Sequence, residues 1–126
     1  MTARIMVVDD NASNRELLLY LLRAFGYEVE GFEGGLAALE ALRADRFDLA
    51  LVDVLMPDID GYEFARRVKR DPDRRSIALV AVTALAMPGD REKAIAAGFD
   101  GYIAKPIDPP AFAGELARFL PPHFSA

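Results

Sequence analysis

The chain alternates short apolar runs with helix-length amphipathic stretches, and this alternation restricts its possible folds more than any other feature. Ile5–Val8 is a continuous apolar run, as expected of a strand covered on both faces. Asn14–Phe25 instead places its leucines on one helical face, and Gly26 ends that pattern. The expected strands are Arg4–Val8, Glu28–Phe32, Leu49–Asp53, Ala78–Thr83 and Gly101–Ala104. The expected helices are Asn14–Phe25, Gly34–Ala44, Tyr62–Lys69, Pro88–Ala97 and Asp108–Leu120.

Strands that alternate with helices predict an α/β protein with a parallel sheet covered on both faces. Right-handed crossovers leave few topologies for such a sheet. The length and the number of elements fit a flavodoxin-like (βα)5 three-layer sandwich with strand order 2-1-3-4-5. The sequence contains no internal repeat, low-complexity tract or linker. We therefore expect one domain over residues 1–126.

The composition argues against several classes of protein. Hydrophobic residues make up 52% of the 126 residues, which is enough for a core, and the net charge of −5 argues against direct nucleic-acid binding. The basic cluster within residues 66–75 is interleaved with acidic residues, so we expect a solvated helix face and loop. Without cysteine, neither disulfides nor thiolate metal sites can form. No leader peptide or membrane-spanning run is visible, which predicts a cytoplasmic protein without membrane insertion.

Four of the predicted strands end at reactive polar residues. Asp9 and Asp10 follow the first strand and Lys105 follows the fifth, whereas Asp53 ends the third and Thr83 ends the fourth. In a parallel sheet these groups meet at the carboxyl edge, where open α/β sheets bind ligands. Because the first and third strands are neighbours in the expected order, their carboxylates meet at the crevice. The pattern predicts a site for a divalent cation and a phosphoryl group.

The three carboxylates indicate a hard cation. Carboxylates crowded together repel one another unless a cation lies between them. Oxygen ligands without His or Cys favour Mg²⁺, with Mn²⁺ as the alternative. Taken alone, Asp9 and Asp10 equally fit a helix cap or a strand that ends in solvent. The presence of Asp53 after a second buried strand favours the metal site.

Asp53 has the chemistry of a phosphoryl acceptor. A carboxylate can attack phosphorus to give an aspartyl phosphate. Mg²⁺ and Lys105 can neutralise the charge of the transferred group, and Pro106 restrains the backbone beside that lysine. Lys105 alone would also fit an ordinary surface lysine.

Two further residues near the expected site each allow two interpretations. The Thr83 hydroxyl can donate to a phosphoryl oxygen, with small Ala84 leaving space, but threonine is also an ordinary strand residue. Tyr102 fits equally a core aromatic or a half-buried ring that changes position when Thr83 moves.

These residues together resemble the receiver domain of two-component response regulators. The matching elements are Asp9–Asp10, Asp53 with Met56–Pro57, Gly61, Thr83–Ala84 and Tyr102-x-x-Lys105-Pro106. The match covers Arg4 to Leu120. The segment Val82–Asp90 is similar to stand-alone, single-domain receivers of cell-cycle phosphorelays and to receivers of hybrid histidine kinases.

The resemblance implies a phosphoryl switch. A phosphohistidine on a histidine kinase or histidine phosphotransfer protein would donate its phosphoryl group to Asp53. Mg²⁺ would be held by Asp10, Asp53 and the backbone carbonyl of Leu55, with Asp9 helping directly or through water. Lys105 would hold a phosphoryl oxygen, Thr83 would move toward it, and Tyr102 would swing inward.

The resemblance also implies structural and docking roles. The residues with structural roles would be Pro57, Gly61 and Pro106. The kinase-docking surface would include Asn11, Asn14, Leu17, Leu18 and Ile107. Leu17 and Leu18 also fit the core, which we expect for at least one of them. Output would pass to an unknown downstream protein by direct contact.

Leu55 and Leu85 depart from the pattern of many receivers, which carry a polar or charged group at one of these positions. Leucine cannot orient an attacking water molecule. We therefore predict slow loss of the phosphoryl group.

Three other functions fit parts of the pattern. An aspartyl-phosphate phosphohydrolase needs a second carboxylate two residues after the nucleophile, where this chain has Leu55. A flavin-binding module needs a phosphate-cradling loop after the first strand, whereas Asp9–Asp10–Asn11 would repel phosphate. A receiver-like scaffold that no longer accepts phosphate finds no support in the intact residue set.

Overall fold

Five parallel strands form one sheet in the computed structural model, which describes residues 2–84 and 87–120. The strands are β1 (Arg4–Val8), β2 (Glu28–Phe32), β3 (Leu49–Val52), β4 (Ala78–Thr83) and β5 (Gly101–Ala104). The helices are α1 (Ala12–Ala24), α2 (Gly35–Ala44), α3 (Gly61–Arg70), α4 (Asp90–Ala97) and α5 (Pro109–Ala117). Among the described residues, none of these helices combines the length and apolarity needed to cross a bilayer.

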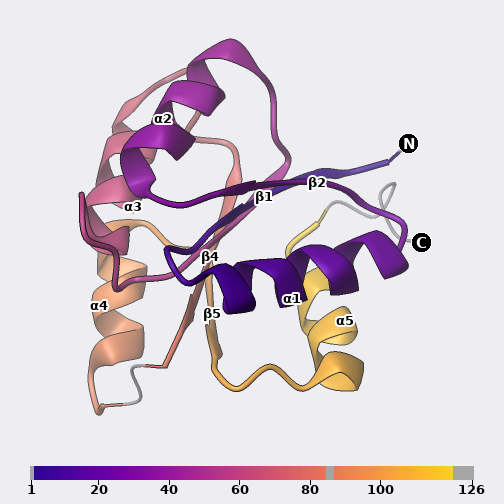
Figure 1. Cartoon of the computed structure of the whole chain (residues 1–126). Coiled ribbons are helices and arrows are strands. Elements are labelled where there is room, and N and C mark those ends of the chain that lie inside the picture. The colour runs from indigo at the N-terminus through magenta and orange to yellow at the C-terminus, as the bar shows by residue number, and fades with distance from the viewer. Residues whose placement is uncertain (1, 85–86, 121–126) are drawn as a thin grey trace.

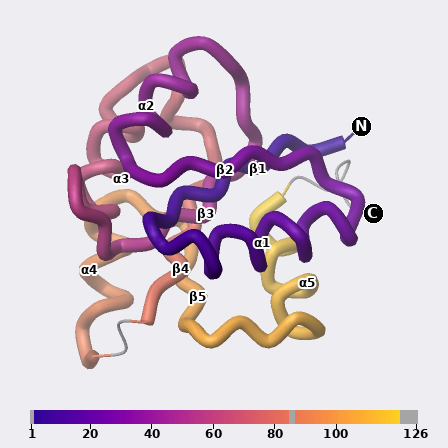
Figure 2. The backbone as a smooth tube through the Cα atoms, in the orientation of Figure 1, coloured from indigo at the N-terminus to yellow at the C-terminus, as the bar shows by residue number. Residues whose placement is uncertain are grey.

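The strand order β2-β1-β3-β4-β5 confirms the predicted flavodoxin-like topology. Helices α1 and α5 cover one face of the sheet, and α2, α3 and α4 cover the other (Figures 1 and 2). Side chains of β1 alternate between the two core clusters: Ile5 and Val7 pack toward α1 and α5, and Met6 and Val8 toward the other helices. A strand covered on both faces must be apolar at every position, which explains the continuous hydrophobic run.

Helix α1 begins two residues before the predicted start. We expected Asn14, but the helix begins at Ala12 because Asn11 is its N-cap. The Asn11 side chain accepts a hydrogen bond from the Asn14 backbone N–H at 3.0 Å. Hydrophobic periodicity did not predict this first turn, because none of its residues is a buried apolar side chain.

Helices α4 and α5 also differ from the predicted boundaries. Pro88 was expected in the first turn of α4, but it lies in the preceding turn, and the helix begins at Asp90. Gly89 precedes the helix with a positive φ of 92°, which a helical residue cannot adopt. Helix α5 ends at Ala117 rather than continuing to Leu120, and the next N–H groups bond to carbonyls three residues back. The apolar spacing in the sequence marks side chains that pack against the core, and it continues past the residue where the α-helix ends.

The basic cluster of α3 lies on a solvated helix face, as expected. Glu63 accepts ion pairs from Arg66 at 3.1 Å, Arg67 at 2.9 Å and Arg70 at 3.7 Å. Pairs at this helical spacing stabilise the helix only slightly. Glu63 therefore offsets part of the positive charge on this exposed helix face.

Candidate functional site

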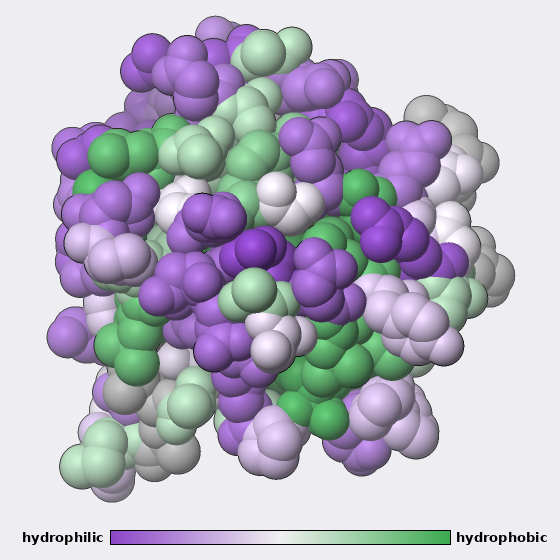
Figure 3. Space-filling model, in the orientation of Figure 1, coloured by the Kyte–Doolittle hydropathy of each residue, from purple (hydrophilic) through white to green (hydrophobic). Residues whose placement is uncertain are grey.

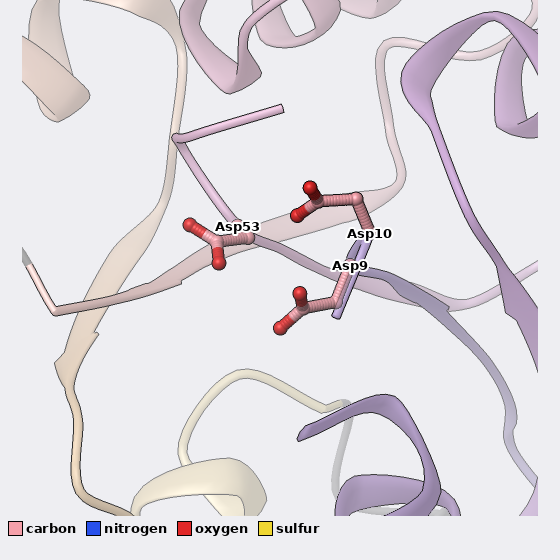
Figure 4. A group of neighbouring side chains, drawn as sticks. All are labelled: Asp9, Asp10 and Asp53. Carbon is pink, nitrogen blue, oxygen red and sulfur yellow. The ribbon is translucent and has the colours of Figure 1, made fainter. Parts of the chain in front are cut away.

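The register of β1 and β3 places two aspartates side by side at the carboxyl edge of the sheet. Val8 pairs with Val52, so Asp9 and Asp53 are the next residues on neighbouring strands. The Asp53 N–H continues the ladder by donating to the Val8 carbonyl at 2.9 Å. Asp10 completes the group: one carboxylate oxygen from each aspartate lies within 4.8 Å of the others (Figure 4). The structure therefore brings together the three carboxylates selected from the sequence.

Local backbone bonds orient two of these carboxylates in a buried setting. Asp9 is 1% exposed and Asp53 is 8% exposed, whereas Asp10 is exposed. The Asn11 N–H donates to Asp9 Oδ1 and the Leu55 N–H donates to Asp53 Oδ1, both at 2.9 Å. Each bond spans two residues and forms a tight turn directly after its strand.

Lys105 bridges the two buried carboxylates. Its Nζ lies 3.0 Å from Asp9 Oδ2 and 2.8 Å from Asp53 Oδ2. Burial acts to lower the pKa of Lys105, but the hydrogen bonds to Asp53 and Asp9 outweigh it, so the pKa lies above its ordinary value. The Lys105 N–H donates to the Thr83 carbonyl at 2.9 Å, which holds the end of β5 beside β4, and the Lys105–Pro106 bond is cis. One ammonium thus shares the site with three carboxylates.

The donor set fits a hard divalent cation. Its three carboxylates have one ammonium among them, so the site retains excess negative charge. Carboxylate oxygens at this spacing, with lone pairs free to donate, suit Mg²⁺, which also keeps several water ligands. Leu55 is 56% exposed, and its backbone N–H donates to a carboxylate of the donor set. The role of the Leu55 backbone carbonyl as a further ligand of the metal stays a prediction.

Thr83 and Tyr102 lie on the side of the sheet that faces α3 and α4. Thr83 is fully buried at the end of β4, and Ala84 after it is exposed. Tyr102 is half-buried and packs against the core cluster that includes α3 and α4. Burial, followed by the charge of Asp90, raises the pKa of Tyr102. Leu85, named above beside the expected pocket, lies outside the described residues.

Gly61 allows α3 to begin directly against the end of β3. A Cβ at this position would lie 2.8 Å from the Asp53 carbonyl oxygen and 2.8 Å from the Val54 Cα, too close for any side chain. The Gly61 N–H instead donates to the Val54 carbonyl at 2.9 Å. Pro57 and Pro106 are exposed in the loops that follow β3 and β5.

A largely apolar groove of about 340 Å³ adjoins the site between α1 and the segment after β5. Its lining residues are Asn14, Leu17, Leu18, Ala84, Lys105, Pro106 and Ile107. Figure 3 shows hydrophobic surface gathered beside α1 on this face. Leu17 is 45% exposed and Leu18 is buried, so one of the two belongs to the core, as expected. Asn11 does not line the groove and its side chain caps α1, so its docking role stays a prediction.

Two residues around the site were missed in the sequence. Arg15, 13% exposed, donates from Nη1 to the Asp9 carbonyl at 2.8 Å, and nothing in its local sequence distinguishes it from a surface arginine. Asp58 bonds the N-terminus of α2. Here a signal existed, because Gly34–Gly35 opens a helix without any side chain that could cap it.

The fold and the site together define a class of flavodoxin-like proteins. In this class, a lysine pairs with acidic residues at the carboxyl edge of the sheet, where β1 and β3 are neighbours. The sequence matches the response regulator receiver domain over residues 5–116, and the chain belongs to this family. Receiver domains act as signalling switches in two-component systems. They accept phosphoryl groups from histidine kinases or phosphotransfer proteins and bind Mg²⁺ in their acidic site.

Relatives and solved structures match over nearly the whole chain. The polar-differentiation response regulators DivK of Brucella ovis and Brucella anthropi are each 39% identical over 120 residues, covering 95% of this chain and 98% of theirs. The chemotaxis protein CheY4 of Vibrio cholerae superposes with a TM-score of 0.90 at 31% identity, covering 95% and 100%. The receiver domain of sensor histidine kinase PA1611 from Pseudomonas aeruginosa gives 0.86 at 32%, covering 94% and 98%. That structure has a magnesium ion coordinated in its active-site cleft.

Proposed function

We propose that this protein is a stand-alone receiver that accepts a phosphoryl group from a phosphohistidine onto Asp53 and signals by protein contacts in a phosphorelay. The observation that carries the proposal is the Lys105 ammonium bonded to Asp53 and Asp9, with Asp10 exposed beside them. This arrangement places a nucleophile, a cation and free carboxylate oxygens within one small site. We propose no separate enzymatic activity, since Leu55 stands where an aspartyl-phosphate phosphohydrolase needs its second carboxylate.

The transfer is a displacement at phosphorus. A carboxylate oxygen of Asp53 attacks, the N–P bond of the phosphohistidine breaks, and its electron pair stays on the imidazole nitrogen. The product is an aspartyl phosphate. Lys105, which bonds Asp53 Oδ2 before transfer, moves its ammonium to a phosphoryl oxygen and offsets its charge.

The metal would be held by Asp10, Asp53 and the Leu55 carbonyl, with Asp9 helping directly or through water. Bound Mg²⁺ supplies charge neutralisation for the phosphoryl oxygens during transfer. Mn²⁺ has the same preference for oxygen ligands and is the alternative cation.

The phosphoryl group then changes the surface formed by α4, β5 and α5. The phosphoryl group carries a charge of roughly −1.5 to −2, which replaces the single negative charge of the Asp53 carboxylate beside the end of β4. Thr83 moves toward this charge and Tyr102 swings inward. The buried position of Thr83 at the strand end and the half-buried ring of Tyr102 support this path. Met87 and Ile95, 69% and 48% exposed, offer apolar contacts to a downstream protein.

The groove beside α1 is the proposed docking surface for the phosphohistidine protein. It contains Lys105 of the site in its lining, so a helix bound there would bring its histidine close to Asp53. Leu17→Glu should slow transfer from a phosphorylated phosphotransfer protein that loads the wild type, yet leave loading by acetyl phosphate intact. Tyr20→Glu is the matched control, since Tyr20 is 70% exposed on the same helix and does not line the groove. Equal transfer to both variants would exclude this surface.

The central experiment is incubation with acetyl phosphate and Mg²⁺ followed by intact mass spectrometry. The wild type should gain one phosphoryl group, and Asp53→Asn should gain none. Asp73→Asn is the matched control, because Asp73 is an exposed aspartate in the turn that precedes β4, at the opposite edge of the sheet. EDTA should abolish the modification. An unmodified wild type, or an equally modified Asp53→Asn variant, would overturn the proposal.

A further inference from the structure

The N-terminus of α2 is capped by a residue from another loop. Gly34 occupies the N-cap position without a side-chain bond, and the first turn of the helix carries no acidic residue. The carboxylate of Asp58, in the loop between β3 and α3, accepts N–H bonds from Leu36 at 2.9 Å and Gly35 at 3.2 Å. It also accepts from the adjacent Ile59 N–H at 2.7 Å. Asp58 thus replaces both the local cap and the acidic first turn that stabilise most helices.

The loop and the helix approach so closely that side chains at the glycines would not fit. A Cβ at Gly34 would lie 2.7 Å from Asp58 Oδ2, and a Cβ at Gly35 would lie 2.6 Å from Ile59 Cγ1. Burial acts to raise the pKa of Asp58, but the backbone N–H bonds lower it below its ordinary value, so the carboxylate is ionised at neutral pH. The carboxylate of Asp58 therefore makes a close-packed, charged contact with the N-terminus of α2, which we call the latch.

The latched loop is also the loop that leaves the candidate site. At its start, the Leu55 N–H donates to Asp53 Oδ1 at 2.9 Å. At its end, the Gly61 N–H donates to the Val54 carbonyl at 2.9 Å. These bonds tie the two ends of the loop to residues that directly follow β3, whereas Asp58 ties its middle to α2, which packs on the sheet.

We propose that Asp58 is a positioning residue, which holds the β3–α3 loop against α2 so that Asp53 and Leu55 are ordered for Mg²⁺ and phosphoryl binding. The inference rests on the proposed function, in which Asp53 and the Leu55 carbonyl hold the metal. A loop without this latch must be ordered when the metal binds, and that loss of conformational freedom weakens binding. Latching the loop in advance removes this cost.

A pair of variants separates loop positioning from helix capping. Asp58→Ala removes both functions. Adding Gly34→Asp to that variant supplies a local cap, because the backbone at Gly34 is extended, with φ −159° and ψ 167°, and accepts any residue. The close contact at position 34 disappears once Asp58 is alanine. The double variant therefore has a capped helix and an untethered loop.

The readouts are the unfolding temperature in EDTA, the Mg²⁺ dissociation constant from titration calorimetry, and the hydrogen exchange of the backbone amides of residues 55–59 other than Pro57. Asp58→Ala should lower the unfolding temperature by about 5 °C and weaken Mg²⁺ binding about threefold to tenfold, the cost of ordering the loop on binding. The double variant should recover the unfolding temperature but keep the weakened Mg²⁺ binding and the faster exchange. Asp58→Asn, which retains one accepting oxygen, should fall between wild type and Asp58→Ala. Asp73→Ala should change none of these values.

Recovery of wild-type Mg²⁺ affinity in the double variant would overturn the inference, since capping alone would then explain Asp58. Unchanged Mg²⁺ affinity in Asp58→Ala would do the same. If Asp58→Ala fails to fold, Asp58→Asn and the double variant carry the test. Failure of the proposed function is distinguishable, because it appears as a wild type that takes no phosphoryl group, whereas the exchange of the same backbone amides reports the latch without any transfer.

Discussion

The two ends of β1 carry similar sets of charges in different surroundings. At the amino end, the guanidinium of Arg4 lies within 4.0 Å of three carboxylates. These acidic neighbours are Asp45, Glu28 and Glu30. At the carboxyl end, the ammonium of Lys105 shares its site with three carboxylates. These are Asp9, Asp10 and Asp53.

Burial is what distinguishes the two clusters. The acidic side chains around Arg4 are 53–66% exposed, whereas those of Asp9 and Asp53 are 2% and 10% exposed. Water screens the amino-terminal cluster, so its ion pairs contribute little to stability. At the carboxyl end, screening is weaker and the uncompensated carboxylates favour a cation. The same charges thus make a surface network at one end of the strand and a binding site at the other.

The largest difference should appear when the cation of each cluster is removed. In EDTA, Lys105→Met should lower the free energy of unfolding by about 3–5 kcal/mol, because two buried carboxylates lose their partner. Arg4→Met should lower it by about 1 kcal/mol or less, because its partners are screened. Urea denaturation measures both values. Equal losses would show that burial does not separate the clusters.

The next effect concerns added Mg²⁺. At a concentration of about 100 times the dissociation constant, Mg²⁺ should stabilise the wild type by about 2.7 kcal/mol. Asp10→Asn should lose most of this stabilisation, because the exposed carboxylate loses its negative charge and one of its two oxygens. Asp45→Asn, at the other end of β1, should keep it. Thermal unfolding with and without MgCl₂ measures the effect, and a shift that survives in Asp10→Asn would place the cation elsewhere.

A smaller effect concerns hydrolysis of the aspartyl phosphate at the carboxyl end of β1. Leu55 brings no polar side-chain group to the rim of the site, so we expect the aspartyl phosphate to decay slowly, over minutes or longer. Leu55→Asn should accelerate its loss about tenfold, equivalent to one hydrogen bond that orients water. The loss of phosphoryl mass with time after removal of acetyl phosphate gives the rate. The interpretation is wrong if the wild type decays within seconds or if the Asn variant decays more slowly.

The smallest effect is a pH dependence of opposite sign at the two ends. Burial acts to lower the pKa of Lys105, but hydrogen bonds to Asp53 and Asp9 outweigh burial and hold this pKa above 10.5. The stability that Lys105 contributes is therefore complete below that pH and is lost as the pH rises through the raised pKa. The hydrogen bond from Arg4 holds the pKa of Asp45 below 3.8, so its contribution is complete above that pH and is lost in acid. Stability differences between wild type and Lys105→Met or Asp45→Asn, measured on either side of these values, should shrink in alkali and in acid respectively. A constant difference would contradict the assignment.

Much of the fold and of the site could be predicted from local sequence. Continuous apolar runs such as Ile5–Val8 report strands buried on both faces, and helical spacing reports the faces of α1 and α5. Helix ends were less accurate, since the start of α4 at Asp90 depends on a positive φ at Gly89 and not on hydrophobic spacing. The role of Asn11 as the N-cap of α1 was also missed in the sequence, and its docking role stays a prediction.

The sequence by itself determined which chemical groups end each strand and, through the parallel topology, that they meet at one edge of the sheet. Only the tertiary structure decided how those groups bond: Lys105 joins Asp9 and Asp53 across separations of 96 and 52 residues, and Asp58 caps a helix 22 residues before it. The physical reason is the range of the interactions. Side-chain periodicity is a property of neighbouring residues, whereas burial and ion pairing depend on which distant segments the folded sheet brings into contact.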